Sequence, residues 1–95
     1  MANLVDQLRA AVTGRVQGVS FRYYTRREAN ILGLTGWIRN EYDGSVLVVA
    51  EGSKHQLEKL LTYLHKGPPS AIVDHVITEW SQSPPVYKDF EIRWL

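Results

Sequence analysis

The sequence predicts an α+β fold, a two-layer sandwich in which two helices cover one face of an antiparallel sheet. Three observations lead to this prediction. The 95 residues suffice for one domain, taken as residues 1–95, with a single hydrophobic core. Segments with the apolar alternation of strands are interrupted twice by segments with the apolar spacing of helices. Glycine and proline mark the boundaries between these segments.

The N-terminal third predicts a strand, a loop and a helix. Apolar residues alternate with polar or small ones in the first strand, at Leu8, Ala10 and Val12. Gly14 and Gly18 bracket a short loop, and Ser20 is a suitable N-cap for a helix that runs to about Leu32. Gly33 stands where a glycine commonly ends a helix. One face of this helix is formed by Phe21, Tyr24, Thr25, Ala29 and Leu32.

The middle of the chain predicts two strands joined by a tight turn. They cover residues 34–40 and 45–51, and Asp43-Gly44 between them is a hairpin signal. The second of these strands is apolar at every position from Val46 to Ala50, so both of its faces are apolar. That pattern suits a central strand of a sheet with helices on one face.

The second helix is predicted by its ends and by its apolar stripe. Ser53 and Gln56 form a capping-box pair at its start. The stripe consists of Leu57, Leu60, Leu61 and Leu64. Gly67-Pro68-Pro69 ends the helix, and residues 72–80 form a further strand. A last short strand carries Phe90, Ile92 and Trp94 on one face.

The resulting order is strand, helix, strand, strand, helix, strand, with an extra strand at the end. Two split strand–helix–strand units interleave most simply as a ferredoxin-like sandwich. The order of the strands within the sheet does not follow from these patterns.

Composition and charge narrow the classes of function. The apolar content of 44% and the charged content of 22% are ordinary, and a net charge of +1 argues against general affinity for nucleic acids or anionic membranes. The strand over 45–51 also lacks the aromatic residues of an RNA-recognition strand. No cysteine is present, which excludes disulfides, thiolate nucleophiles and cysteine metal sites. The N-terminus, from Met1 to Asp6, has no apolar run of a signal peptide, and no stretch approaches a membrane span, so we expect a cytoplasmic monomer.

The segment from Thr13 to Arg22 has the composition of an anion-binding site. Its glycines allow backbone conformations that turn several N–H groups toward one point. The helix start that follows adds unpaired N–H donors and a partial positive charge. Arg22 lies in the first turn, where a cation is unfavourable for the helix dipole. A guanidinium that forks onto phosphate oxygens would explain its presence there.

Two related phosphate motifs are absent from the sequence. The ATP-binding pattern GxxxxGK[ST] does not occur. The cysteine-to-arginine loop of tyrosine phosphatases is impossible without cysteine, so no thiol phosphoenzyme can form.

Two motifs resemble signatures of the acylphosphatase family. Residues 14–22, Gly-Arg-Val-Gln-Gly-Val-Ser-Phe-Arg, resemble the first signature, and residues 36–40, Gly-Trp-Ile-Arg-Asn, begin the second. The second continues with Gly44, Val46 and Gly52, and the similarity spans nearly the whole chain. One departure is Ile38, where the family usually has a smaller residue. Another is the ending over residues 90–95, which runs slightly past the usual aromatic end. Neither departure is expected to touch the chemistry.

The resemblance implies hydrolysis of carboxyl–phosphate anhydrides on a ferredoxin-like fold, without a metal or other cofactor. By position, Arg22 matches the family's phosphate-binding arginine and Asn40 its water-positioning asparagine. The family's phosphate cradle corresponds to the backbone N–H groups of Arg15, Val16, Gln17, Gly18, Val19 and Ser20. The implied partners are a small acyl phosphate as substrate and inorganic phosphate as product and inhibitor.

Other interpretations stay open at this point. Gln17 could serve only as a hydrogen-bonding residue of the loop, and Arg15 could be merely exposed. The histidines are scattered relative to the motif, which argues against a histidine nucleophile; they are His55, His65 and His75. A module that binds a regulatory anion without turnover would carry the same loop. A piece of a larger carbamoyl-phosphate enzyme is a third reading, which the complete start and compact end argue against.

Overall fold

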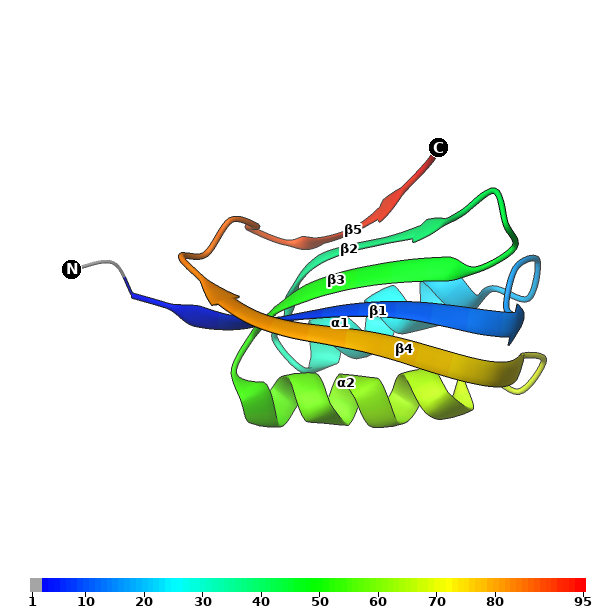
Figure 1. Cartoon of the computed structure of the whole chain (residues 1–95), viewed down its shortest axis with the longest axis horizontal. Helices are drawn as coiled ribbons and strands as arrows, with labels where there is room; N and C mark the ends of the chain where they lie inside the picture. Colours follow the sequence, from blue (N-terminus) through cyan, green and yellow to red (C-terminus); the bar gives the residue numbers. More distant parts are fainter. Residues whose placement is uncertain (1–2) are drawn as a thin grey trace.

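A five-stranded sheet and two helices form the described part of the chain, residues 3–95, in the computed structural model (Figure 1). The strands are β1 (Val5–Arg15), β2 (Thr35–Asn40), β3 (Val46–Gly52), β4 (Ile72–Ser83) and β5 (Phe90–Arg93). The helices are α1 (Phe21–Ile31) and α2 (Lys54–Lys66), and both cover the same face of the sheet. The prediction of a two-layer α+β sandwich is therefore confirmed. Met1 and Ala2, part of the N-terminal segment predicted to lack a signal peptide, lie outside the described residues.

The strands follow the order β4-β1-β3-β2-β5 across the sheet. Neighbours are antiparallel except β5, which runs parallel to β2, so the sheet is mixed and the prediction of a purely antiparallel sheet is wrong in this one pair. The reason is the direction of the chain. β4 ends at the end of the sheet where β2 begins, and the chain crosses that end and returns as β5 in the direction of β2.

A buried carboxylate holds this crossing segment in place. Glu51, at the end of β3, is only 2% exposed. Its carboxylate accepts hydrogen bonds from the backbone N–H groups of Val86 and Tyr87 at 2.9 and 3.2 Å, and from the side chain of Gln7 at 3.1 Å. The segment between β4 and β5 is thereby fixed to the sheet, which determines where β5 begins.

The strand β3 has the two apolar faces that its sequence predicts. Toward the helices its side chains join the main core, which also contains the fully buried side chains of Leu8, Ala10, Val12, Ile38, Leu57, Leu60 and Leu64. On the opposite face Leu47 and Val49 form a smaller cluster with Trp37. The bulk of Ile38, the first departure from the family pattern, is accommodated inside the main core.

The two helices match their predicted ranges but differ in detail. Ser53 caps α2 by accepting the N–H of Gln56 at 3.3 Å, but the Gln56 side chain does not complete the capping box and instead donates to the Leu32 carbonyl oxygen. In α1 the buried residues are Phe21, Thr25 and Ala29, whereas Tyr24 is 37% exposed although we expected it on the core face. Neither helix has the length and apolar character that crossing a membrane requires.

Candidate active site

The sequence motifs come together at one end of the sheet, on the right in Figure 1. β1, β2 and β5 end there, and α1 begins there. An open cleft of ≈ 400 Å³ lies at this end. Its lining residues are Val16, Gly18, Ser20, Phe21, Arg22, Tyr23, Asn40, Ile92 and Trp94.

The loop between β1 and α1 presents backbone N–H groups that have no hydrogen-bond partner in the described part of the chain. Val16 anchors the loop, since its side chain is 1% exposed and packs in the main core. Gly18 and Ser20 have positive φ angles of 74° and 61°, whereas Val19 between them does not. Alternation of this kind turns successive N–H groups to one side and produces an anion-binding concavity. Among residues 3–95, no backbone or side-chain acceptor receives an N–H of residues 16–20.

Ser20 occupies the N-cap position of α1, as expected, but does not cap the helix with its side chain. Its left-handed backbone conformation helps to turn the N–H groups of the loop to one side. Its carbonyl oxygen accepts the first helical hydrogen bond, from the N–H of Tyr24 at 3.1 Å. The start of α1 therefore keeps its unpaired N–H donors and its partial positive charge facing the cleft.

Arg22 adds a cation to this helix start. It lies in the first turn of α1, is half-buried, and lines the cleft. Its guanidinium carbon lies 4.2 Å from the centre of the Trp94 ring. Within the described residues its N–H donors have neither a hydrogen-bond acceptor nor an ion-pair partner. These donors are thus free for an anion.

Asn40 is the last residue of β2 and contributes an unused acceptor. Its Oδ1 atom is buried and accepts no hydrogen bond from residues 3–95. Its position depends on Gly36, which has a φ of 141° and lies so close to β3 that a Cβ would collide with the Val49 carbonyl oxygen. The glycine lets β2 approach β3, and the ladder that follows pairs Asn40 with Val46. Buried acceptors without a protein donor are commonly satisfied by water.

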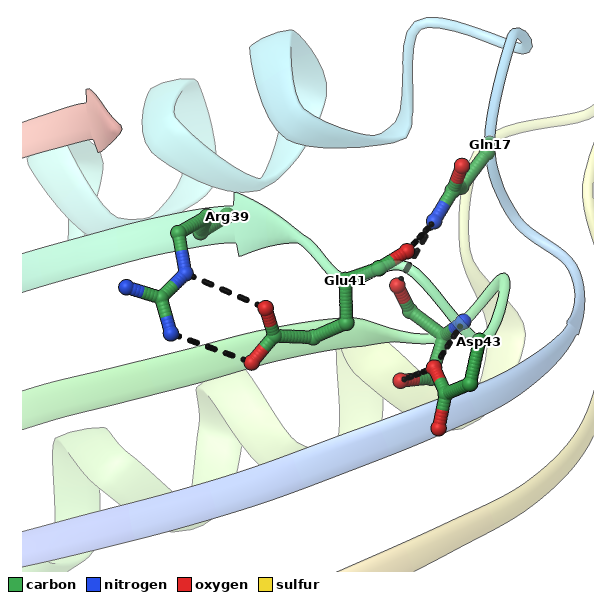
Figure 2. A network of polar contacts seen from close by, with 5 residues as sticks. Gln17, Arg39, Glu41 and Asp43 are labelled. Atoms are coloured by element: carbon green, nitrogen blue, oxygen red, sulfur yellow. Dashed lines mark hydrogen bonds and ion pairs between the residues drawn. The ribbon is translucent and has the colours of Figure 1, made fainter. Parts of the chain in front are cut away.

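Gln17 connects the two motifs, as Figure 2 shows. Its Nε2 atom donates to the carbonyl oxygens of Glu41 and Ser45, at 2.8 and 2.9 Å. These two residues form the mouth of the hairpin between β2 and β3, directly after Asn40. The side chain of Gln17 therefore holds the loop of the first motif against the strand end of the second. It does not line the cleft itself.

The hairpin has its own internal hydrogen bonds (Figure 2). Arg39 forms two hydrogen bonds of 3.1 Å with the carboxylate of Glu41, and this carboxylate raises the pKa of Arg39. The Asp43 carboxylate accepts hydrogen bonds from the Ser45 hydroxyl at 2.6 Å and the Ser45 N–H at 2.9 Å. These bonds hold the pKa of Asp43 below its usual range. An ionised carboxylate is the stronger acceptor for both bonds, which therefore stabilise the turn of the hairpin.

The structure brings together most of the predicted site residues, but not all of them. Val16, Gly18, Ser20, Arg22 and Asn40 line one cleft. Arg15 does not, and the prediction that it belongs to the loop is wrong, because β1 continues through it in register with Ile72. Arg15 and Val19 line a second hollow of ≈ 480 Å³ on the other side of the loop, beside Tyr24 and residues 68–70.

The third side of the cleft is formed by Tyr23, Ile92 and Trp94, none of which is predicted from the sequence as a site residue. The expectation that the C-terminal departure stays away from the site is wrong for Trp94. The alternation of Phe90, Ile92 and Trp94 was the available signal, but its use requires knowing that β5 lies next to β2. The histidines His55, His65 and His75 are exposed, and none of them lines the cleft. Among residues 3–95 there is no cluster of acidic and histidine side chains that could hold a metal ion.

Comparison with known proteins agrees with the two motifs. The family model described as Acylphosphatase matches residues 8–92. An acylphosphatase of Salinibacter ruber is 49% identical over 84 residues, which are 88% of each chain. The crystal structure of the acylphosphatase from Bacillus subtilis has a TM-score of 0.90 at 36% identity and covers 93% of this chain and 98% of that one. The structure of an acylphosphatase from Coxiella burnetii has a TM-score of 0.87 at 38% identity, with 96% and 94% covered.

Proposed function

The chain belongs to the acylphosphatase family, and we propose that it hydrolyses acyl phosphates by direct attack of water on a phosphoryl group held in the cleft. The products are a carboxylate and inorganic phosphate. Arg22 and the N–H groups of residues 16–20 hold the phosphoryl group, and Asn40 places the water. The observation that carries this proposal is the convergence of Gly18, Ser20, Arg22 and Asn40 on one cleft from two distant segments of the chain.

The phosphoryl group binds where the fixed donors converge. The free N–H groups of the loop and of the start of α1 supply hydrogen bonds and a partial positive charge. The guanidinium of Arg22 supplies a full charge and a planar pair of donors that match two phosphate oxygens. In the metaphosphate-like transition state the negative charge is spread over the three equatorial oxygens, and these fixed donors stabilise it electrostatically.

The attacking water binds to Asn40. Its buried Oδ1 has no donor among residues 3–95, so it can accept one hydrogen bond from a water molecule and orient a lone pair of that water toward phosphorus. An amide is too weak a base to remove a proton from water. This suffices because a metaphosphate-like transition state requires mainly that the water is correctly oriented.

The leaving group requires little assistance. A carboxylate is a stable leaving group, so its oxygen needs no strong acid to protonate it. Among the described residues, those that line the cleft include no aspartate, glutamate, histidine or lysine. This lining suits acyl phosphates and does not suit alkyl phosphate esters, whose alkoxide must be protonated as it leaves.

Isotope incorporation tests the direction of attack. Benzoyl phosphate is hydrolysed by the enzyme in ¹⁸O-labelled water, and both products are analysed by mass spectrometry. We expect one labelled oxygen in inorganic phosphate and none in benzoate. Label in benzoate would mean that water attacks the carbonyl carbon, and the proposed roles of Arg22 and Asn40 would be wrong.

Rapid acid quench during the first turnover tests for a covalent intermediate, and the uncatalysed reaction is the control for the isotope measurement. We expect no phosphate bound covalently to the protein at any time. Protein-bound phosphate that forms and decays at the rate of turnover would replace direct attack by a two-step mechanism.

A further inference from the structure

The side chain of Trp94 is a part of the cleft that the proposed mechanism does not use. Phe90 and Ile92 point from β5 into the helix layer, and Trp94 continues the same alternation one residue beyond the strand. The last pair between β2 and β5 is Arg39 with Arg93. Asn40 is the residue after Arg39 on β2, and Trp94 is the residue after Arg93, just past the end of β5. The sheet therefore places Trp94 at the level of Asn40, beside the first turn of α1.

We propose that Trp94 is a positioning residue that holds the Arg22 guanidinium in its phosphate-binding orientation. The inference rests on the proposed role of Arg22 in binding the phosphoryl group. The guanidinium carbon lies 4.2 Å from the ring centre, which is well within the range of a cation–π contact. Trp94 is 74% exposed, so this contact is not a consequence of packing in the core.

The contact with the ring and the fork onto phosphate can use different parts of the Arg22 guanidinium. A guanidinium stacks on an aromatic ring with its flat face and donates hydrogen bonds from its edge. Arg22 can therefore keep its contact with Trp94 while its N–H groups bind two phosphate oxygens. A carboxylate partner in place of the ring would occupy those same N–H groups and compete with the substrate.

Arg22 needs such a partner because, within residues 3–95, no hydrogen bond or ion pair holds its guanidinium. An arginine side chain has many rotamers, and a cation in the first turn of a helix is repelled by the helix dipole. Arg39 shows the contrast, because its guanidinium is fixed by two hydrogen bonds to Glu41. The negative face of the indole ring offsets the repulsion of Arg22 without using its N–H donors, and a pre-ordered arginine loses less entropy when phosphate binds.

The test measures competitive inhibition by inorganic phosphate, with benzoyl phosphate as the substrate. Trp94→Ala should weaken phosphate affinity by roughly 2- to 30-fold, the range expected from cation–π contacts. Trp94→Phe should recover part of that loss, whereas Trp94→Leu, which keeps an apolar side chain without a π system, should not. The matched control is Trp80→Ala, because Trp80 lies in β4, contacts Lys54 and does not line the cleft. This variant should bind phosphate as the unaltered protein does.

A double-mutant cycle separates this inference from the proposed function. In the Arg22→Ala background, Trp94→Ala should cause no further loss of phosphate affinity, because the ring acts through Arg22. Equal losses in both backgrounds, or full recovery by Trp94→Leu, would overturn the positioning role. Unchanged affinity in Trp94→Ala together with a loss in Arg22→Ala would also overturn it, while leaving the role of Arg22 intact. Unchanged affinity in Arg22→Ala would instead overturn the proposed function itself.

Discussion

The link between the two motifs predicts that Gln17→Ala damages both stability and turnover. The Gln17 side chain makes two hydrogen bonds, of 2.8 and 2.9 Å, to the mouth of the hairpin that follows Asn40. A hydrogen bond of this kind contributes about 0.5–1.5 kcal/mol net, so losing both lowers the free energy of unfolding by about 1–3 kcal/mol. For a domain of this size each kcal/mol shifts Tm by roughly 4–8 °C.

The effect on catalysis follows from geometry. Without the link, the phosphate loop and Asn40 are free to move apart, and a displacement near 1 Å between reacting groups can reduce the rate by about 100-fold. We expect kcat/KM for benzoyl phosphate to fall by roughly 10- to 100-fold in Gln17→Ala. Steady-state kinetics and thermal unfolding on the same preparation measure both effects.

A second substitution at the same position tests whether the donor character of the Gln17 side chain matters. Gln17→Glu keeps the size of the side chain but places a carboxylate against two carbonyl oxygens, so its pKa should be raised and the variant should be less stable than Gln17→Ala at neutral pH. Protonation restores one donor, so part of this difference should disappear as the pH falls through that raised pKa. The control is Gln82→Ala, which removes an exposed hydrogen bond to Asp6 at the opposite end of β1 and should change Tm little. A Tm of Gln17→Ala equal to that of Gln82→Ala would refute the argument.

Three further predictions follow from the site. Arg22→Ala should weaken phosphate binding and slow the reaction, whereas Asn40→Ala should leave phosphate affinity nearly intact and reduce kcat by roughly 100-fold or more, which phosphate titration beside steady-state kinetics would show. Activity should survive exhaustive chelation, and loss of activity that magnesium restores would contradict the mechanism. The hydrogen bonds from Ser45 lower the pKa of Asp43 in the folded protein. They therefore stabilise the fold at pH values above the pKa of Asp43 in the unfolded chain, and this contribution is lost as the pH falls through the lower pKa of the folded state. Thermal unfolding from pH 6 to pH 2.5 should therefore show a steeper loss of Tm in the unaltered protein than in Asp43→Asn.

The sequence predicted most of the fold because its local signals agree with the tertiary structure. The leucine stripe of α2 and the two apolar faces of β3 each determine a position relative to the core, and both are confirmed. The parallel pairing of β5 could not be predicted. It depends on where the chain crosses the end of the sheet, and that crossing is fixed by hydrogen bonds to Glu51 from residues distant in sequence.

The candidate site was predictable where function leaves a local pattern and was missed where it depends on contacts between elements. Glycines beside a helix start identify an anion loop, and the arginine in the first turn stands out against the helix dipole. The hydrogen bonds of Gln17 and the cation–π contact between Arg22 and Trp94 join segments far apart in the chain, and no spacing within one segment indicates them. Ser20 was predicted in part: it occupies the N-cap position of α1 as expected, but its side chain does not cap the helix and its backbone has a left-handed conformation.

The place of β1 between β3 and β4 has a consequence for how the chain folds. Val12 pairs with Val46 on one side, and Val5 pairs with Ser83 on the other, so β1 finds both of its partners across long stretches of sequence. Among the strands of the described residues, only β2 and β3 form a local hairpin. Such topologies close large loops before their contacts form, and folding on the scale of milliseconds to seconds or longer is typical of them. We expect the pairing of β1 with its two neighbours to limit the rate of folding, so a substitution that strengthens either helix should slow unfolding more than it speeds folding.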